Sequence, residues 1–468
     1  MVFLEPRSEP RSECPARVVL TIKHAVDQKT LLLVSPAPVR RTNGRRYMES
    51  QAVNGLLRWS DNFNSLIATY VCYPEEMADL MSGVRWECID GRSDLERITI
   101  VDLPYGYGPL LHFKFLGSIK ETLRPLIAKS HYMSFAIGGY FGDWGSVAAG
   151  LATKQKRQFA VWTDRVESSV IRSGAKSKRN WIKKIYAIAY SWFVHWHERR
   201  VIRSASLGLF HGKDTFDAYS SCMKSSFNVL NIHLKNTDRI KPEDVLSKAI
   251  SQTAGSRAFV VHDLHLSAAQ RVSQQIAADK ENNADFNNMP LRVGYAGRAA
   301  DMKAPMDWLK VVHTVKEMGV DIRATWLGDG PLLANMAEFV KQHGLEEAVQ
   351  LPGFIAEREH VVDALRSWDV LLFTHVTPES PRILLEAMVS ATPIVGYSSS
   401  YARDLVSGFG ERYLVPIGHT DELAEKLVYL HRNRKEWGRL VNETYAHSEE
   451  FNDVAVFKHR SDLIKKYL

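Results

Sequence analysis

Residues 291–297, LRVGYAG, and residues 322–331, IRATWLGDGP, each have the pattern of a short buried strand that ends in a glycine turn. Helical sequence follows each of them, the first helix beginning near Pro305. Three more strands of this kind are VQLPGF (349–354), WDVLLFTH (368–375) and TPIVGY (392–397). Short strands that alternate with helices are typical of a parallel sheet wrapped by helices. The five units predict a Rossmann-like domain, whose ligand binds at the carboxyl ends of the strands.

The first half of the chain shows the same alternation. We expect strands at Leu31–Ser35, Ser65–Cys72, Ile98–Leu103, Phe159–Thr163, Leu207–His211 and Asn228–His233, with helices around Pro109–Ala128 and Trp181–Arg203. A further strand, Ala258–His265, has no clear place. Because 468 residues exceed one ordinary core, the chain fits two domains of about 200 residues. The fold class predicted is α/β, with two Rossmann-like parallel-sheet domains.

Composition and charge narrow the class of protein. Hydrophobic residues make up 45% and charged residues 24% of the chain, as in a globular protein. The four cysteines lie far apart, without metal-binding spacing or a disulfide framework, which favours a reducing compartment. The net charge is +7, yet residues 172–203 alone hold nine Lys or Arg against one acid, Glu198. The basic charge is therefore confined to one segment. A nucleic-acid-binding protein is more often basic over a whole face, so this distribution argues against that class. We expect a cytoplasmic location, with attachment to the inner face of a membrane left open.

The most informative motif is TPESPRILLEAM, residues 377–388. Ser380 suits an N-cap and Pro381 a first helical residue, so a helix is expected to begin there. Its free N–H groups and positive dipole end then form an anion site. The carboxylates of Glu379 and Glu386 suit the vicinal hydroxyls of a sugar or ribose. The alternative is a capped surface helix with two solvated glutamates.

Two other turns accompany this motif. Gly297 lets the backbone approach a phosphate, and Arg298 with Lys303 can neutralise a diphosphate. Fixed cations also stabilise the charge that builds up when a nucleoside diphosphate leaves. Gly328 lies in the turn of the next strand and is expected to pack close to the nucleotide. Taken alone, the two cations could equally be surface charges.

The ordered set GYAGR…K, WLGDGP, LPGF and TPESPRILLEAM…TPIVGY resembles the donor-binding half of retaining glycosyltransferases of family 4, which have the GT-B fold. The resemblance covers about Leu291 to Pro416. It implies two domains facing across a cleft, a diphosphate bound by Arg298 and Lys303, and a Glu-x7-Glu motif that holds the sugar and the ribose. Ser380, Pro381 and Arg382 are then further donor-binding residues.

This chain departs from the family pattern at three places. Only six residues separate Glu379 from Glu386, so Pro378 occupies the position of the first glutamate. Glu386 carries over as the ribose ligand and Glu379 as the sugar ligand. Ala304 stands where a glycine usually follows the lysine. Asp164 follows the strand Phe159–Thr163, at the place where many members have a histidine after their fifth strand, and a helix N-cap is its equal alternative.

The resemblance also gives a domain layout and a function. We predict a disordered tail at 1–17, an N-terminal domain at 18–280, a nucleotide-sugar-binding domain at 281–450 and a tail at 451–468 that returns to the first domain. The predicted activity is transfer of a hexose-type sugar from a nucleotide-diphosphate donor to a glycan or lipid-linked acceptor. No Asp-x-Asp occurs, so no metal or other cofactor is expected. A nucleotide-sugar epimerase and a catalytically inactive sugar-binding relative are the alternatives.

Features of the first half bear on the acceptor. The loop Gly138–Trp144 is expected to line the cleft, and His211–Lys213 is a weaker candidate near the diphosphate. Arg40, Arg41, Arg45 and Arg46 suit an anionic acceptor or a solvated cluster. The basic segment is rich in aromatic residues, with Trp181, Ile185, Ile188, Trp192 and Trp196 on one helical face. That face suits either an anionic membrane surface or packing on the sheet.

Overall fold

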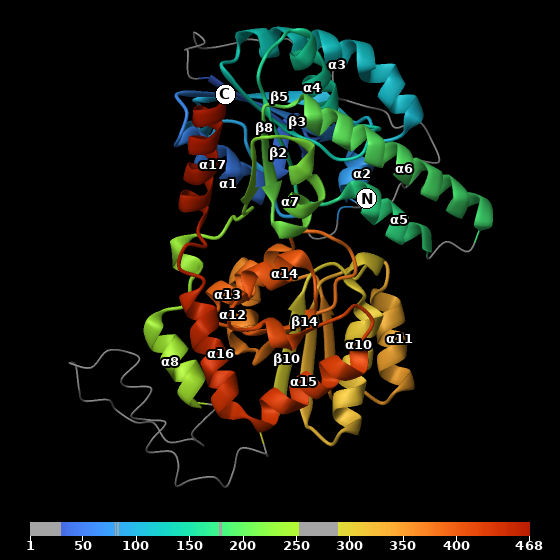
Figure 1. Cartoon of the computed structure of the whole chain (residues 1–468), viewed down its shortest axis with the longest axis vertical. Coiled ribbons are helices and arrows are strands. Elements are labelled where there is room, and N and C mark those ends of the chain that lie inside the picture. The colour runs from blue at the N-terminus through green and yellow to red at the C-terminus, as the bar shows by residue number, and fades with distance from the viewer. Residues whose placement is uncertain (1–29, 80, 82–83, 177–179, 252–288) are drawn as a thin grey trace, which may run out of the picture. The chain divides into compact units, whose positions relative to one another are not determined.

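The computed structural model describes residues 30–251 and 289–468, except 80, 82, 83 and 177–179 (Figure 1). The predicted tail at 1–17 and the predicted strand Ala258–His265 lie outside these residues. The chain divides into two compact units. Unit 1 contains residues up to His233 together with Thr377–Ser380 and Asp453–Leu468, and unit 2 contains Leu234–Val376 and Pro381–Asn452.

Unit 1 is built on a nine-stranded sheet. Its strands are β1 (Thr30–Thr42), β2 (Arg45–Glu49), β3 (Ser65–Tyr73), β4 (Trp86–Cys88), β5 (Ile98–Pro104), β6 (Tyr132–Ala136), β7 (Ala160–Thr163), β8 (Leu207–His211) and β9 (Ser226–Val229). All pair in parallel, in the order β5-β3-β1-β6-β7-β8-β9, except β2 and β4. The strand order with β1 at the centre is that of a Rossmann-like sheet, as predicted.

The antiparallel pairing of β1 with β2 was not predicted. Asn43 and Gly44 both have positive φ (51° and 73°) and turn β1 back into β2, with Arg41 opposite Arg46. Asn-Gly is the usual sequence for such a two-residue hairpin turn, because both positions need the left-handed region. The four arginines Arg40, Arg41, Arg45 and Arg46 therefore lie on the two strands of a hairpin.

Helices cover both faces of this sheet. Those of unit 1 are α1 (Ser50–Ser60), α2 (Glu75–Asp79), α3 (Pro109–Lys129), α4 (Trp144–Lys154), α5 (Glu167–Lys176), α6 (Trp181–Ser204), α7 (Lys213–Tyr219) and α17 (Asp453–Tyr467). Buried side chains of α3, α4 and α6 pack on one face, and those of α1 and α17 on the other (Figure 1). Asn54 donates a hydrogen bond to Asp453 (3.0 Å), which ties the start of α17 to α1.

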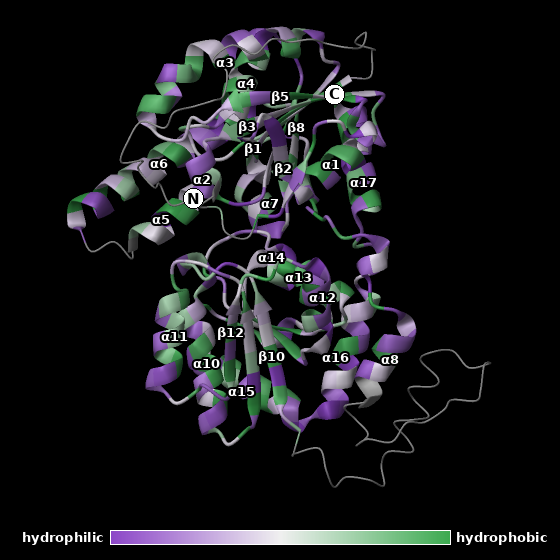
Figure 2. Cartoon of the chain, turned by 180° about the vertical axis from the view of Figure 1, so that it is seen from behind, coloured by the Kyte–Doolittle hydropathy of each residue, from purple (hydrophilic) through white to green (hydrophobic). Residues whose placement is uncertain are grey.

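Unit 2 contains a six-stranded parallel sheet in the order β12-β11-β10-β13-β14-β15. The strands are β10 (Leu291–Ala296), β11 (Ile322–Leu327), β12 (Val349–Gly353), β13 (Val370–Phe373), β14 (Ile394–Tyr397) and β15 (Leu414–Val415). The helices are α8 (Pro242–Ser251), α10 (Pro305–Glu317), α11 (Leu333–Gln342), α12 (Arg358–Ser367), α13 (Arg382–Val389), α14 (Ser400–Leu405), α15 (Thr420–Arg432) and α16 (Arg434–Ala446). Hydrophilic and hydrophobic residues lie side by side on them (Figure 2), as on helices with one buried face.

The boundary between the units differs from the predicted position at residue 280. Ile240 donates a backbone hydrogen bond to Val389 (2.8 Å), and Lys248 on α8 donates to the Thr392 hydroxyl (2.7 Å). Lys248 is buried, and this burial lowers its pKa to about 7. These contacts join Ile240 and α8 to unit 2, so the boundary lies at Leu234.

Two further features of the described residues are the length of their apolar helices and the state of their cysteines. No helix among them is long and apolar enough to cross a membrane. Cys88 and Cys222 are free thiols.

The turns after β10, β11 and β12 are joined through their backbones. Gly297 donates to the Leu327 carbonyl (2.8 Å) and Gly328 to the Gly353 carbonyl (2.8 Å). A Cβ at Gly328 would lie 2.1 Å from the carbonyl oxygen of Gly297, and its φ is +143°. Only glycine permits this approach of one turn to the next.

We predict that Gly328→Ala destabilises the fold more than Gly319→Ala, measured by urea unfolding. Gly319 also has positive φ (+81°), but a Cβ there meets nothing within 4 Å. Its substitution should cost about 1 kcal/mol, from backbone strain alone. Crowding adds to that strain at Gly328, so a loss on the order of 3 kcal/mol is expected. Equal losses at both positions would contradict the close packing of the two turns.

Candidate functional site

Lys303 is held by a buried chain of polar side chains at the carboxyl end of the unit 2 sheet. The Lys303 Nζ lies 3.3 Å from His375 Nδ1, and His375 Nε2 lies 2.5 Å from the Tyr295 hydroxyl. Because an ammonium group can only donate, Nδ1 accepts and Nε2 carries the proton toward Tyr295. Tyr295 and His375 are buried. Their hydrogen bonds hold the Lys303 side chain in one position without a bound ligand.

The backbone around Lys303 is fixed as well. The Thr374 hydroxyl donates to the Lys303 carbonyl (2.9 Å), and the Val376 amide donates to the Met302 carbonyl (3.0 Å). Ala304 has φ +43° and ψ +57°, a left-handed conformation that links the short helix Asp301–Lys303 to α10. This conformation explains why glycine is the usual residue at this position in the family that the sequence resembles.

Arg298 follows Gly297 at the end of β10, and its side chain is exposed. Within the described part of the chain it forms no ion pair. The structure therefore leaves its guanidinium group available to a ligand, in contrast to Lys303. Whether the two cations share one anion is part of the proposal below.

The predicted helix start is wrong by one residue. Pro381 has ψ 119°, an extended value, so α13 begins at Arg382 and no side chain caps its first turn. The Ser380 hydroxyl instead donates to the His211 carbonyl, and its amide donates to the Asp164 carbonyl (3.2 Å). Ser380 is thus engaged with the ends of β7 and β8, and tertiary hydrogen bonds override its local preference for an N-cap.

Glu386 lies on the second turn of α13 and is paired with Arg358. The Arg358 Nη1 lies 3.5 Å from Glu386 Oε1, and the Arg358 Nη2 lies 3.1 Å from Asp238 Oδ2. Burial raises the pKa of Glu386, although the neighbouring Arg358 and Arg382 lower it. Arg358 thereby orients this carboxylate, whose side chain is 20% exposed.

A second group of candidates lies within unit 1. Residues 378–380 run antiparallel to 164–166, with a bridge between Glu379 and Arg165 and a hydrogen bond from the Val166 amide to the Pro378 carbonyl (3.4 Å). Arg165 Nε also contacts Glu167 Oε2 (2.6 Å). The acids Glu167, Asp164 and Glu379 raise the pKa of Arg165. This pairing holds the segment that contains Glu379 beside Asp164.

Asp164 itself is exposed and lies three residues before α5, which begins at Glu167. It therefore does not occupy the N-cap position that was its alternative. Its carbonyl binds Ser380, while its carboxylate faces solvent.

Other predicted candidates have structural partners. Arg41 pairs with Asp102 (2.6 Å), and Arg46 pairs with Asp90 (2.8 Å), so these arginines stabilise the hairpin region. Lys213 pairs with Asp217 on its own helix. Tyr140 and Asp143 from the loop Gly138–Trp144 line a cavity of unit 1. Among the described residues no group of three His, Cys, Asp or Glu is placed to hold a metal ion.

Sequence reasoning missed two residues of the site, His375 and Arg358. His375 ends the run WDVLLFTH, and a polar residue at the carboxyl end of a parallel strand is a usable signal. Arg358 starts α12 after a turn. Nothing local distinguishes it from other surface arginines, because its partners Asp238 and Glu386 are distant in sequence.

Comparison with known proteins shows which family the second half of the chain is similar to. Residues 277–447 match the family described as "Glycosyl transferases group 1". The amylovoran biosynthesis glycosyltransferase of Erwinia amylovora is 23% identical over 281 residues, which are 58% of this chain and 66% of that protein. The 2-deoxystreptamine glucosyltransferase of Streptomyces kanamyceticus is 30% identical over 132 residues, 28% of this chain and 34% of that protein. Two relatives named for colanic acid biosynthesis, from Escherichia coli and Salmonella typhimurium, are matched over 36% and 50% of their own lengths.

Solved structures show the fold. The complex of Anabaena HepE with UDP has a TM-score of 0.59 at 13% identity, covering 94% of this chain and 100% of that one. Sucrose-phosphate synthase from Thermosynechococcus elongatus has a TM-score of 0.61 at 12% identity, covering 94% and 98%. The predicted GT-B fold, with two parallel-sheet domains, is confirmed.

We predict that His375 and Lys303 act together in binding a nucleoside diphosphate. Lys303→Ala should weaken the binding of UDP or GDP about tenfold or more in isothermal titration, because a charge-assisted contact is lost. His375→Phe should weaken it less and should add little to Lys303→Ala, since it acts through the lysine.

Lys310→Ala, which removes an exposed cation of α10 that pairs with Asp307 (3.1 Å), is the matched control and should bind normally. Fully additive effects of His375→Phe and Lys303→Ala would show that the histidine does not position the lysine.

Proposed function

We propose that this chain is a glycosyltransferase that moves a hexose-type sugar from a nucleotide-diphosphate donor to a glycan or glycolipid acceptor. The observation that carries the proposal is the fixed Lys303, with Arg298 in the same connection between β10 and α10, inside the segment that matches the glycosyl transferases group 1. The fold-level neighbour HepE was solved with UDP and with UDP-glucose. A nucleotide-sugar donor for this chain is consistent with that likeness.

The proposed chemistry depends on charge at the leaving group. Breaking the bond between the sugar and the diphosphate builds negative charge on a phosphate oxygen. A lysine already held by His375 stabilises that charge without having to reorganise during the reaction. Glu386, held by Arg358, would accept hydrogen bonds from the ribose hydroxyls in ground and transition states alike.

Metal independence and retention are part of the proposal. Two cations supply the positive charge that a divalent ion gives in other transferases, and the sequence has no Asp-x-Asp. Glu379 and Asp164 are proposed to face the transferred sugar and the acceptor hydroxyl. Retention of the anomeric configuration rests on the resemblance to family 4.

The acceptor side of the proposal includes a membrane surface. On α6, Trp181, Ile182, Ile185, Tyr186, Trp192 and Trp196 are more than half exposed. Lys183 and Lys184 are exposed between them, and the single acid of the segment, Glu198, is buried. An aromatic helix face with adjacent cations suits the anionic surface of a bilayer.

The alternative role of α6 is packing against the rest of unit 1. That role applies to a different side of the helix. Phe141 stacks on Tyr190 (5.8 Å between ring centroids), and Tyr140 meets Phe193 edge-on (4.9 Å). Val194, Val201 and Ile202 are buried. The helix thus packs along one side and leaves a second, aromatic side exposed.

We predict that the purified protein transfers sugar from a UDP- or GDP-sugar in excess EDTA at the rate seen with Mg²⁺, and that NMR of the product shows the donor anomer retained. Arg298→Ala or Lys303→Ala should lower kcat/KM by a factor on the order of 10². Full turnover by the variant that combines Arg298→Ala with Lys303→Ala would refute the assigned diphosphate site. Donor binding without any turnover would favour an inactive relative, and epimer formation without transfer would favour the epimerase.

We predict that the protein sediments with vesicles containing anionic lipid and much less with neutral vesicles. Lys183→Gln with Lys184→Gln should weaken this binding roughly tenfold or more, at about 1 kcal/mol for each cation. Lys341→Gln with Lys435→Gln, two exposed cations of unit 2, is the charge-matched control. Equal recovery with both vesicle types would leave α6 with a packing role only.

A further inference from the structure

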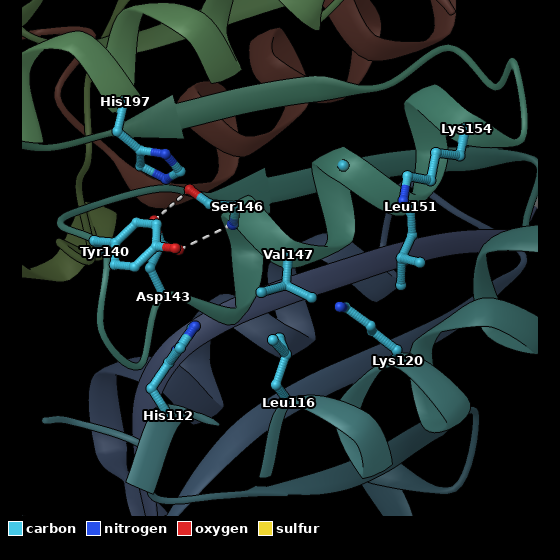
Figure 3. Close-up of a pocket in the computed structure, with 11 residues that line it drawn as sticks. His112, Leu116, Lys120, Tyr140, Asp143, Ser146, Val147, Leu151, Lys154 and His197 are labelled. Atoms are coloured by element: carbon cyan, nitrogen blue, oxygen red, sulfur yellow. Dashed lines mark hydrogen bonds between the residues drawn. The ribbon is translucent and has the colours of Figure 1, made fainter. Parts of the chain in front are cut away.

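Unit 1 contains a cavity of about 210 Å³ between α3, α4, α6 and the loop after β6 (Figure 3). Its apolar part is formed by Leu116 of α3 together with Val147 and Leu151 of α4. The remaining lining side chains are polar and come from α3, from α6, and from α4 together with the loop that precedes it. This cavity contains none of the residues assigned above to the donor or to the reaction.

One end of the cavity offers uncharged hydrogen-bonding groups. The His197 Nε2 is buried and has no hydrogen-bond partner among the described residues. Burial and the nearby Arg200 lower the pKa of His197 to about 4, so this imidazole is neutral at pH 7. Tyr140 lies against the same ring, with 4.9 Å between the centroids (Figure 3). A buried ring nitrogen without a partner is costly unless a ligand binds it.

The acid of this end, Asp143, is engaged within the protein. Its Oδ1 accepts from the Ser146 amide (3.0 Å), and its Oδ2 accepts from the Gly138 amide (3.2 Å) and from the Ser146 hydroxyl. His112 is likewise engaged, since its Nδ1 accepts from the Gly142 amide (3.2 Å). These bonds shape the cavity wall, and they leave His197 as the unsatisfied group.

The other end of the cavity carries positive charge. Lys120 of α3 and Lys154 of α4 both line it (Figure 3). Neither ammonium group takes part in an ion pair within the part of the chain that the structure describes. Two lysines from different helices without an acidic partner are suited to a phosphate or carboxylate group.

We propose that this cavity binds a sugar unit that carries a phosphate or a carboxylate group. The anion would meet Lys120 and Lys154, and a hydroxyl would meet His197 Nε2. The C–H face of the ring would lie on Leu116, Val147 and Leu151. A volume of about 210 Å³ is below the range of about 300–1,000 Å³ typical of drug-sized ligands, and it suits a single sugar residue. The assignment of this unit to the acceptor rests on the proposed function.

Isothermal titration without any donor tests the binding itself. Glucose 1-phosphate and glucuronate should bind to the wild-type protein, and glucose should bind at least tenfold more weakly because it lacks the anion. Inorganic phosphate should also bind at least tenfold more weakly than glucose 1-phosphate. Equal binding of phosphate and the sugar phosphate would overturn the sugar part of the proposal, as would the absence of binding by both anionic sugars.

Variants then locate the site. Lys120→Gln with Lys154→Gln should reduce the affinity for glucose 1-phosphate about tenfold or more, and Lys129→Gln, an exposed lysine of α3 outside the cavity, should not. His197→Phe keeps the ring and removes Nε2, so we expect a loss of about threefold to tenfold. Affinity unchanged in the double lysine variant would overturn the proposal.

The same variants separate this inference from the proposed function. The double lysine variant should bind UDP or GDP normally and hydrolyse the donor normally, while transfer to acceptor declines. If sugar phosphates fail to bind but transfer proceeds, the cavity proposal alone is wrong. If they bind as expected while no nucleoside diphosphate binds, the proposed transferase function fails and the cavity remains a site for anionic sugars.

Discussion

The hydrogen bond from the Gly297 amide to the Leu327 carbonyl extends the pairing of β10 and β11 beyond the last residue of the first strand. It brings two backbone turns so close that no side chain fits at Gly328. This contact sets where the chain leaves the sheet before Arg298. The Ala299 amide, which donates to the Asp329 carbonyl (2.9 Å), and the contacts of Thr374 and Val376 then hold the segment up to Lys303.

The side chain of Lys303 is held by residues from two neighbouring parallel strands. Its side chain is long and flexible, and holding it costs side-chain entropy. Here that entropy is lost on folding, through His375 and Tyr295, and not on binding a ligand. The two partners lie on neighbouring strands, β10 and the end of β13, whose carboxyl ends meet because the strands are parallel. The same geometry brings residues 164–166 and His211 of unit 1 to Ser380.

In unit 1 the helix α6 has a buried side and an exposed side, which carry different kinds of residue. The buried side carries Glu198, whose pKa burial raises to about 7, and its exposed side carries the aromatic and basic residues. Part of the aromatic side contacts the loop after β6, and that contact forms one wall of the cavity containing His197. One helix therefore contributes to the core, to an exposed surface and to a candidate ligand site.

The sequence by itself determined the strands of both sheets to within a few residues, with the exceptions of β2, β4, β6 and β15, which were not predicted, and of β1, which extends to Thr42 beyond the predicted Leu31–Ser35. Buried parallel strands are continuous β-branched runs, and such runs are visible without any tertiary information. The glycine turns and Lys303 followed from the same local pattern. Asn43–Gly44 is a usual sequence for a two-residue hairpin turn, but the hairpin was not predicted.

Only the tertiary structure decided how the candidate residues are held. Ser380 binds His211 and Asp164 instead of capping α13, because partners that are distant in sequence outcompete a local hydrogen bond. The same holds for Glu386 with Arg358, and for α8, which joins unit 2 through Lys248. Sequence patterns report the period of burial along one segment. They carry no information on which segment supplies the partner, since that depends on how the chain closes over hundreds of residues.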